Sequence, residues 1–196
     1  MTQEASTTQQ EIEIKVRLTD RIGIQAILPT LGFRLVTPET LERNTLFDTQ
    51  DGRLRQARQL LRIRQYGSRW ILTHKAPSES ANARHKVRLE TETEVDNGQI
   101  LAAIFEQLGY QPVFLYEKLR TEWSDGKGHI VVDVTPIGDY VELEGEPDWI
   151  DTTADRLGFT TAQYLTASYG QIFLEWKNAT QHPATNMTFA EIQMGS

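Results

Sequence analysis

Two pairs of glutamates stand in alternating segments near opposite ends of the chain: Glu11 and Glu13 in EIEIKVRL, and Glu142 and Glu144 in YVELEG. Successive side chains of a β-strand point to opposite faces, so both carboxylates of each pair lie on one face. Carboxylates are the ligands that hard divalent cations prefer, whereas Arg and Lys side chains bind phosphate or carboxylate groups. These residue types therefore raise the question of a site that holds a metal ion together with an anion.

The basic residues follow the same alternation. The segments LLRIRQY and RWILTHKAP predict a hairpin around a Gly67-Ser68 turn, with Arg62, Arg64 and Lys75 as its charged members. The longest alternation is HKVRLETETEV, and it places both signs of charge on one face. The residues on that face are Lys86, Arg88, Glu90, Glu92 and Glu94.

The elements that must position these side chains can be located by periodicity, caps and turns. Asp20 is the expected N-cap of a first helix that ends at Gly32 and that Pro29 shortens or kinks, and Asp96 or Asn97 caps a second helix over 98–109. A last helical region covers about 151–175. The strands are expected at 11–18, 41–49, 60–66, 69–77, 85–95, 116–123, 129–135 and 140–145.

An internal near-repeat suggests how these elements assemble. AILPTLGF is echoed by AIFEQLGY, and each lies between an alternating acidic strand and a further strand. The repeat predicts two βαββ-type halves related by approximate symmetry. About eight antiparallel strands with few helices favour a closed barrel, because closure removes the unpaired strand edges. The predicted fold class is therefore α+β, an eight-stranded antiparallel β-barrel with helices packed on its outside.

The pattern also predicts which face lies inside the barrel. The helices need apolar surface to cover, and the apolar strand faces supply it, so the charged faces are left pointing into the barrel. Such an interior is tolerable only as a wet tunnel whose charges bind ions of opposite sign. A polyanion such as triphosphate, bound with Mg²⁺ or Mn²⁺, meets both needs. The alternative is a solvated sheet face with cross-strand Glu–Arg pairs, which are common on protein surfaces.

Composition limits the other classes. The chain has 196 residues, no cysteine, a net charge of -7 and a pI near 5.2. These values exclude disulfides and thiolate sites and argue against a general nucleic-acid binder. No apolar run is long enough to span a bilayer and the first residues lack a signal-peptide pattern, so no membrane association and a cytoplasmic location are expected.

The ordered set of motifs resembles the CYTH domain, the family of triphosphate tunnel metalloenzymes. EIEIK has the Glu-x-Glu-x-Lys form that opens this domain, and the later family motifs follow in order: LRIR, the strand ending in Lys75, RLETE, EKLR, the Asp of VVDV, GDYVELEG and Ser168-Tyr169. The stretches LGYQPVFLYEKLR and GDYVELEG are similar to the class IV adenylate cyclase branch. The expected division is a disordered segment over 1–9, a tunnel domain over 10–175 and a C-terminal tail over 176–196.

The resemblance implies roles for individual residues. The implied metal ligands, for Mg²⁺ or Mn²⁺, are Glu11, Glu13, Glu142 and Glu144, with Asp133 nearby. Glu90 and Glu92 are implied either as ligands of a second metal, as residues that position a water, or as ion-pair partners of basic side chains. The implied phosphate-binding residues are Lys15, Arg62, Arg64, Lys75, Arg88, Lys118 and Arg120, and the set expected to carry catalysis is Glu11, Glu13, Lys15, Arg64 and Lys75.

Three functions remain open at the level of sequence. The first is a metal-dependent phosphohydrolase acting on inorganic triphosphate, thiamine triphosphate or a nucleoside triphosphate, by in-line attack of water. The second is a class IV-type adenylate cyclase that converts ATP to 3′,5′-cyclic AMP and pyrophosphate. The third is a module that binds polyphosphate or nucleotide without turnover. We rank hydrolysis first as the less demanding reaction. Homodimers are common in the cyclase branch, so a homodimer is an open alternative to a monomer.

Overall fold

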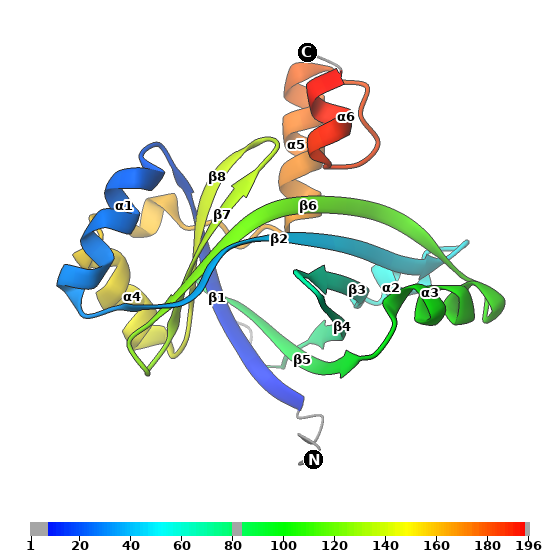
Figure 1. Ribbon diagram of the computed structural model, residues 1–196, viewed down its shortest axis with the longest axis horizontal. Helices are drawn as coiled ribbons and strands as arrows, with labels where there is room; N and C mark the ends of the chain where they lie inside the picture. The colour runs from blue at the N-terminus through cyan, green and yellow to red at the C-terminus, as the bar shows by residue number, and fades with distance from the viewer. Residues whose placement is uncertain (1–7, 80–83, 195–196) are drawn as a thin grey trace.

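The computed structural model describes residues 8–79 and 84–194, and its strands close into an antiparallel barrel in the cyclic order β1-β5-β4-β3-β2-β6-β7-β8 (Figure 1). The predicted eight-stranded barrel is thereby confirmed. The strands are β1 (Thr8–Leu18), β2 (Arg34–Thr49), β3 (Leu60–Tyr66), β4 (Arg69–Pro77), β5 (Lys86–Val95), β6 (Tyr110–Ser124), β7 (His129–Thr135) and β8 (Gly138–Glu144). The helices are α1 (Arg21–Ile27), η1 (Leu28–Leu31), α2 (Arg53–Gln56), α3 (Gly98–Gln107), α4 (Pro147–Arg156), η2 (Thr161–Gln163), α5 (Tyr169–Thr180) and α6 (Phe189–Met194).

The internal repeat corresponds to two halves of the barrel. Each half has a strand, a helix and three further strands, so each contains one strand more than the predicted βαββ unit. The halves meet at four strand pairs, which are β1–β5, β4–β5, β2–β6 and β1–β8. Replacing each strand by its counterpart in the other half reproduces the same cyclic order in reverse. This topology is consistent with the approximate symmetry that the repeat predicts.

Local sequence explains where the helices begin and end. The Asp20 carboxylate accepts a hydrogen bond from the Gly23 amide and caps α1, and Pro29 lies within the short 3₁₀ turn η1. The Asn97 side chain caps α3 by accepting from two amides. Gly98 follows because the ring of Trp70 lies where a Cβ atom would stand, only 2.1 Å away. Each cap directs the chain from one strand of the barrel towards the next.

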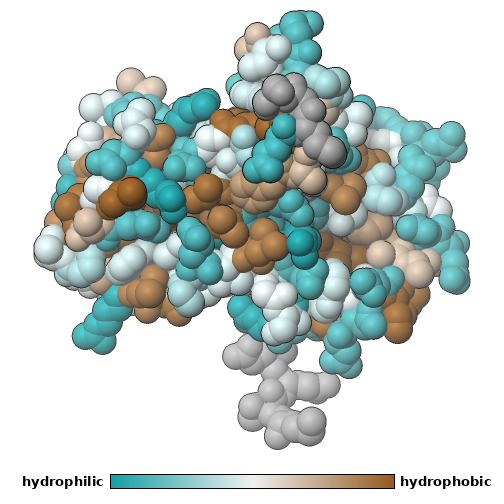
Figure 2. Space-filling model, turned by 45° about the horizontal axis from the view of Figure 1, so that its top comes forward, coloured by the Kyte–Doolittle hydropathy of each residue, from teal (hydrophilic) through white to brown (hydrophobic). Residues whose placement is uncertain are grey.

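Apolar side chains lie on the outside of the barrel wall, where one cluster joins Ile14, Val141 and Leu143 of β1 and β8 to residues of η1 and α4. A second cluster lies at one end of the barrel and joins inward-facing residues of β6 and β8, among them Tyr116 and Tyr140, to α5 and α6. Figure 1 shows α1 and α4 against one side of the barrel and α5 with α6 rising from another. On the outer surface, hydrophilic and hydrophobic residues are interspersed over the face drawn in Figure 2. The helices thus bury the apolar faces and leave the charged faces inside.

The C-terminal region differs from its prediction. The single helical region expected over 151–175 is divided into α4, η2 and α5, and α5 continues to Thr180. The predicted tail therefore starts inside α5 and includes α6, which packs in the second apolar cluster through Ile192. At the other end, β1 already begins at Thr8, while the first seven residues lie outside the described part of the chain.

Two short bridges cover strand edges that the barrel leaves unpaired. Leu165 exchanges backbone hydrogen bonds with Lys15 of β1, and Met187 bonds to the backbone of Leu115 and Glu117 of β6. Edges of this kind otherwise invite pairing with another chain. Both bridges anchor the C-terminal region to the barrel wall.

Within the described residues, none of the helices combines the length and the apolar character that crossing a bilayer requires.

Candidate functional site

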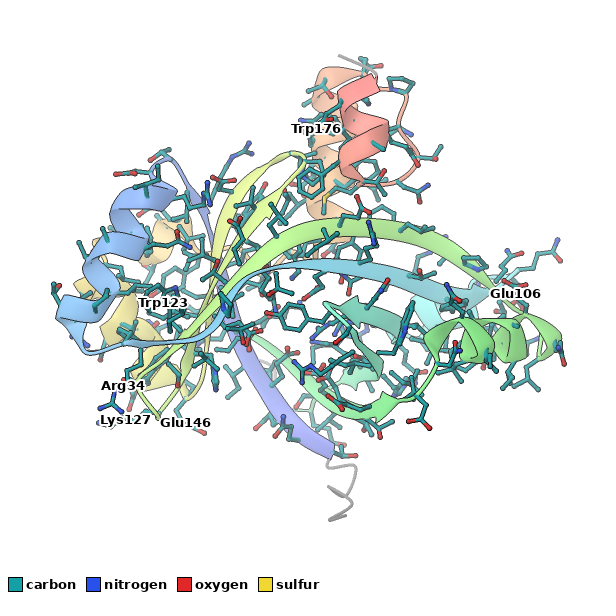
Figure 3. All side chains as sticks on the ribbon, viewed as in Figure 1. Arg34, Glu106, Trp123, Lys127, Glu146 and Trp176 are labelled. Carbon is teal, nitrogen blue, oxygen red and sulfur yellow. The ribbon has the colours of Figure 1, made fainter. Side chains whose placement is uncertain are left out.

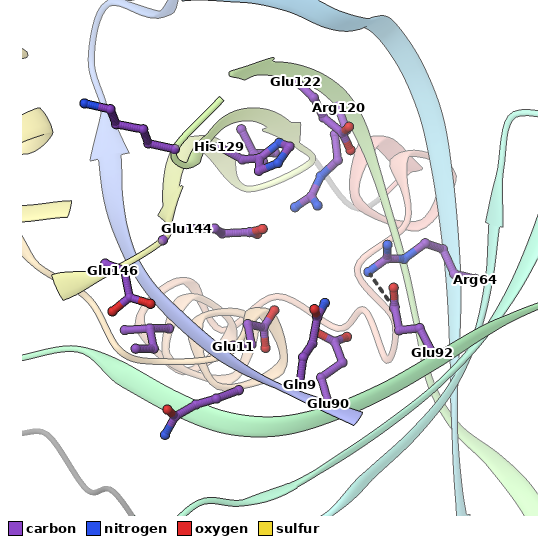
Figure 4. Close-up of a pocket in the computed structure, with 15 residues that line it drawn as sticks. Gln9, Glu11, Arg64, Glu90, Glu92, Arg120, Glu122, His129, Glu144 and Glu146 are labelled. Carbon is purple, nitrogen blue, oxygen red and sulfur yellow. Dashed lines mark ion pairs between the residues drawn. The ribbon is translucent and has the colours of Figure 1, made fainter. Parts of the chain in front are cut away.

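Charged side chains line a cavity at one end of the barrel. Its volume is about 430 Å³, and its wall includes the start of β1, the ends of β6 and β8, and parts of β3 and β5. Glu11, Glu144, Arg64 and Arg120 lie around this space in Figure 4. Lys127 and Glu146, both labelled in Figure 3, belong to the outer part of the same wall. The cavity is therefore open to an anion and to a cation at once.

The opposite end of the charged interior is covered by the start of α5. A Ser168–Gln171 capping box fixes this helix terminus. The buried ring of Tyr169 lies 4.6 Å from Lys15 Nζ and 4.8 Å from Lys118 Nζ, measured to the ring centroid. Its hydroxyl donates a hydrogen bond to Asp133 at 2.7 Å. We conclude that the described cavity is approached from the end that carries Glu11 and Glu144.

Three of the predicted metal ligands come together. Glu11, Glu13 and Glu144 each offer an oxygen atom, and these atoms lie within 4.8 Å of one another. The register explains the grouping, because Glu13 of β1 is the direct cross-strand partner of Glu144 of β8. Three converging carboxylates match the hard oxygen ligands of Mg²⁺ or Mn²⁺. This donor set therefore fits a divalent metal.

The three carboxylates differ in how their charge is compensated. Burial alone would raise the pKa of Glu13, but the charges of Lys86 and Lys15 outweigh it and lower the pKa to about 2. Glu144 is in the opposite situation, since burial and the charges of Glu11 and Glu142 raise its pKa to about 8. Lys75 and Lys86 thus compensate Glu11 and Glu13, whereas burial and acidic neighbours leave Glu144 as the carboxylate whose negative charge a bound cation would compensate.

The other two predicted metal ligands lie elsewhere. Asp133 is fully buried and accepts hydrogen bonds from Lys118, Arg120 and the Tyr169 hydroxyl. Glu142 is paired with Lys15 and with Arg120. Despite burial, the Lys15 and Lys118 charges hold the pKa of Glu142 well below its usual range. Both carboxylates form ion pairs with basic side chains, and neither belongs to the three-glutamate cluster.

Two of the predicted phosphate-binding residues reach the cavity wall directly. These are Arg64 and Arg120, which lie across the cavity from Glu11 and Glu144 in Figure 4. Arg64 is only loosely paired, at 3.8 Å from Glu42 and 4.0 Å from Glu92. Its guanidinium therefore retains the capacity to donate to an anion in the cavity.

The remaining predicted cations form a buried layer behind this wall. Lys75 lies 2.6 Å from each oxygen of Glu11 and 3.2 Å from Glu90. Arg62 bonds to Tyr116, Thr73 and Glu92. Lys15, paired with Glu142, and Lys118, paired with Asp133, are the other members of this layer.

Arg88 is arranged differently from the other predicted cations. It is the cross-strand partner of Glu11, but its guanidinium donates to the backbone carbonyls of Arg58, Lys75 and Ala76. These bonds hold the end of β4 and the turn before β3 together. The structure therefore places Arg88 in a backbone-anchoring position and not on the cavity wall.

Glu90 and Glu92 both lie on the wall. Glu92 accepts hydrogen bonds from Thr73 and Arg62, and these neighbours, with Arg64, bring its pKa down to about 2 against the effect of burial. Burial, reinforced by Glu11 and Glu92, raises the pKa of Glu90 to about 7 even though Lys75 is nearby. Glu92 is an ion-pair partner of the arginines, and Glu90 is the less compensated of the two.

Several functional positions were missed by the sequence reasoning. Glu42 of β2 is fully buried among Arg64, Lys118 and Arg120, and its Oε2 atom has no hydrogen-bond partner among the described residues. The polar alternation of Glu42 and Asn44 in LERNTLF was the available signal. Lys86 lies on the charged face of its strand and Tyr169 belongs to the Ser168-Tyr169 motif, but the sequence pattern predicts no role in the site for either residue. The structure pairs Lys86 with Glu13 at 2.5 Å.

Among the described residues, no Phe, Tyr or Trp ring lines the cavity, and its only ring is the imidazole of His129. Tyr140 is buried against Tyr169 at the covered end, and Phe47 packs against Phe105. Tyr66 is also buried. A stacking surface for a nucleotide base is therefore not part of the described wall.

Comparisons with known proteins show the family of this chain. The CYTH domain profile matches residues 9–162. The adenylate cyclase CyaB of Aeromonas hydrophila is 28% identical over 170 residues, which are 81% of this chain and 86% of the relative.

Solved structures share the fold. A Vibrio parahaemolyticus protein has a TM-score of 0.74 at 17% identity and covers 86% of this chain and 99% of its own. The Hippeastrum protein HpAC1, a candidate adenylyl cyclase with a described dominant triphosphatase activity, has a TM-score of 0.60 at 22% identity and covers 84% of this chain and 95% of its own. Because the family profile spans most of the sequence, this chain belongs to the CYTH domain family.

Proposed function

We propose that the protein is a divalent-metal-dependent phosphohydrolase that acts on a triphosphate substrate. The observation that carries the proposal is a three-glutamate cluster whose members Glu11 and Glu144 line one cavity together with Arg64 and Arg120. Carboxylates that converge within 4.8 Å gain little from binding an anion alone, and arginines gain little from binding a metal alone. A metal–triphosphate complex uses both groups.

The charge balance of the interior supports the same ligand. Most of the buried carboxylates are already paired with buried Lys or Arg side chains, as in Lys15–Glu142 and Arg120–Asp133. A bare triphosphate would add several uncompensated negative charges to this low-dielectric space. A divalent cation that enters with the triphosphate offsets them. We therefore expect the anion to bind tightly only when Mg²⁺ or Mn²⁺ is present.

The chain's own residues divide the work. Glu11, Glu13 and Glu144 would hold the cation, which when bound polarises phosphate oxygens and compensates their charge. Arg64 and Arg120 would donate hydrogen bonds to the phosphates at the wall, and Lys15, Lys75 and Lys118 would supply the positive potential behind them. Glu90, on the wall beside Lys75, would orient the attacking water. No group in this set is required to form a covalent bond with the substrate.

Hydrolysis ranks above cyclisation for a structural reason. A cyclase must fold ATP so that its ribose hydroxyl attacks the α-phosphorus, and this requires a surface that orients the base. The described wall consists mostly of charged and amide side chains with Ile12 and Val131, and its only ring is the imidazole of His129. The triphosphatase activity described for HpAC1 is consistent with this ranking.

A class IV-type adenylate cyclase is the second candidate. It is favoured by the relative from Aeromonas hydrophila, whose name states adenylate cyclase activity. The same tunnel chemistry would serve both reactions, because each breaks a bond of the triphosphate chain.

A product assay separates the candidates. Purified protein is incubated with inorganic triphosphate, thiamine triphosphate or ATP, each with Mg²⁺ or Mn²⁺, and the products are resolved by chromatography. The Glu13→Gln variant serves as the negative control, and EDTA should abolish turnover. Orthophosphate without cyclic AMP supports the hydrolase. Cyclic AMP plus pyrophosphate from ATP supports the cyclase, and binding without any product would leave a non-catalytic module.

A further inference from the structure

Two carboxylates of the three-glutamate cluster already accept hydrogen bonds from lysine ammonium groups. Lys75 Nζ lies 2.6 Å from both oxygens of Glu11, and Lys86 Nζ lies 2.5 Å from Glu13 Oε1. Glu144 has no ion pair within 4.0 Å among the described residues. The two lysines therefore occupy oxygen atoms that a metal ion needs.

An ammonium and a divalent cation compete for the same carboxylates. A hydrogen-bonded ammonium would stand only a few ångströms from the ion, and like charges at such distances repel strongly inside a protein. Coordination of a metal also withdraws electron density from the carboxylate and so weakens its hydrogen bond to the ammonium. Metal entry at this cluster therefore favours the release of at least one of the two lysines.

Lys86 is the lysine better placed to move. It is the first residue of β5 and the direct cross-strand partner of Glu13, on the side opposite to Glu144. Its side chain is 19% exposed, and Glu13 is its only ion-pair partner in the described part of the chain. Lys75 is more enclosed and is held by Glu90 as well as by Glu11.

The pair formed by Lys15 and Glu142 shows what a permanent pair looks like. Both side chains are almost fully buried, Arg120 also bonds to Glu142, and the ring of Tyr169 covers Lys15. Breaking this pair would leave uncompensated charges in the interior, which is strongly destabilising. The Lys86–Glu13 pair is less buried, so separating its two charges requires less free energy.

We propose that Lys86 is an exchanging countercharge: it neutralises Glu13 before metal binds, leaves Glu13 when a divalent cation enters, and then binds a phosphate oxygen of the substrate. The last step rests on the proposed function. Lys86 does not line the cavity while it is paired with Glu13, so this step requires its side chain to extend from the start of β5 to a phosphate coordinated to the same metal. The exchange places a positive charge beside the substrate only after the metal site is filled.

The first test measures Mn²⁺ binding by electron paramagnetic resonance, without any phosphate. Lys86→Met removes the competing charge and should tighten Mn²⁺ binding about tenfold, the worth of one charge-assisted hydrogen bond. Lys86→Arg keeps the charge and should bind Mn²⁺ like the wild type. Lys177→Met, on α5, is the matched control and should also behave like the wild type. A folded Lys86→Met protein whose Mn²⁺ affinity is unchanged or weaker would overturn the proposal.

The same variants are then tested for inorganic triphosphate in the presence of saturating Mn²⁺. Lys86→Met should bind triphosphate about tenfold more weakly, so that metal and anion affinities change in opposite directions. A residue that only supports the fold would weaken both. Weakening of both affinities is therefore a second result against the exchange.

A labelling experiment on the unmodified protein covers the case in which Lys86→Met does not fold. The rate at which an amine-acetylating reagent modifies Lys86 is followed by mass spectrometry, with Lys177 as the internal reference. Mn²⁺ alone should release the amine and raise the rate at Lys86. Inorganic triphosphate added with Mn²⁺ should lower it again. An unchanged rate on adding Mn²⁺ would overturn the exchange.

These results separate the exchange from the proposed function. Release of Lys86 by Mn²⁺ in a protein that turns over no triphosphate would support the exchange and refute the proposed function. Release by Mn²⁺ without renewed protection by triphosphate would overturn the final step, in which Lys86 binds phosphate.

Discussion

Arg120 grips Asp133 through two nearly parallel hydrogen bonds, from Nε to Oδ1 at 2.8 Å and from Nη2 to Oδ2 at 2.7 Å. Asp133 is fully buried, and it also accepts hydrogen bonds from Lys118 and Tyr169. A fork of this kind fixes the plane of the guanidinium as well as its position. Asp133 thus holds two of the cations that we assign to the substrate phosphates.

Replacing Asp133 by Asn should destabilise the protein and leave metal binding largely intact. The variant removes one of the buried carboxylates that compensate Lys118 and Arg120, and breaking a buried ion pair typically costs about 3–5 kcal/mol of unfolding free energy. Denaturant unfolding measures this loss, and Asp148→Asn, at an exposed position of α4, is the control that should cost about 1 kcal/mol or less. Loss of Mn²⁺ binding by folded Asp133→Asn would instead return Asp133 to the metal site.

Replacing Glu13 by Gln should abolish metal-dependent turnover without unfolding the barrel. The amide keeps the shape of the side chain but removes the charge between Lys86 and Glu144 on which metal binding depends. We expect kcat/KM to fall by roughly a hundredfold or more and Mn²⁺ affinity to fall with it. Glu94→Gln is the matched control, because Glu94 is an exposed residue of β5 paired with Arg69. Full activity of a folded Glu13→Gln protein would refute the metal assignment.

Arg64→Ala should weaken substrate binding more than it slows turnover. Arg64 lines the cavity and has only long ion pairs, so its loss removes a donor to phosphate without leaving a strongly paired carboxylate behind. Steady-state kinetics should show a KM raised by roughly tenfold to a hundredfold. Arg69→Ala, at an exposed position of β4, should leave KM unchanged. Equal kinetics for both variants would remove Arg64 from the site.

The stability of the metal-free protein should fall as pH rises through the pKa of Glu144. Burial, Glu11 and Glu142 raise this pKa from 4.5 to about 8, so the folded state holds a proton that the unfolded chain releases. Stability from this proton is fully present below pH 4.5 and is lost as pH rises towards 8. Thermal melts in EDTA at pH 6 and pH 8.5 should show the decline, and Mg²⁺ should reduce it by compensating the carboxylate.

Glu144→Gln is the control for this pH dependence. It cannot ionise, so its melting temperature in EDTA should decline less between pH 6 and pH 8.5 than that of the wild type. A decline identical to that of the wild type would show that the proton lies on another group. Glu90, with a pKa raised to about 7, is the first alternative to test.

The alternation of the strands could be interpreted correctly from sequence because it has a period of two and is independent of the rest of the fold. In EIEIKVRL the apolar set needs helical cover, and α4 provides it, so Glu11, Glu13 and Lys15 had to face inwards. The same argument placed Arg62, Arg64, Glu90 and Glu142 on interior faces. The sequence by itself therefore determined the barrel, the inward direction of its charged strand faces and the identity of nearly all the charged residues on them.

Tertiary structure decided which interior charges meet. Glu142 and Glu144 are identical residues two positions apart, yet the register pairs the first with Lys15 and the second with Glu13. That difference sends Glu142 into an ion pair and Glu144 into the metal cluster. Strand register and the covering of one end by Tyr169 depend on long-range contacts, so no local pattern encodes them. The side-chain pairing inside the barrel follows from those contacts.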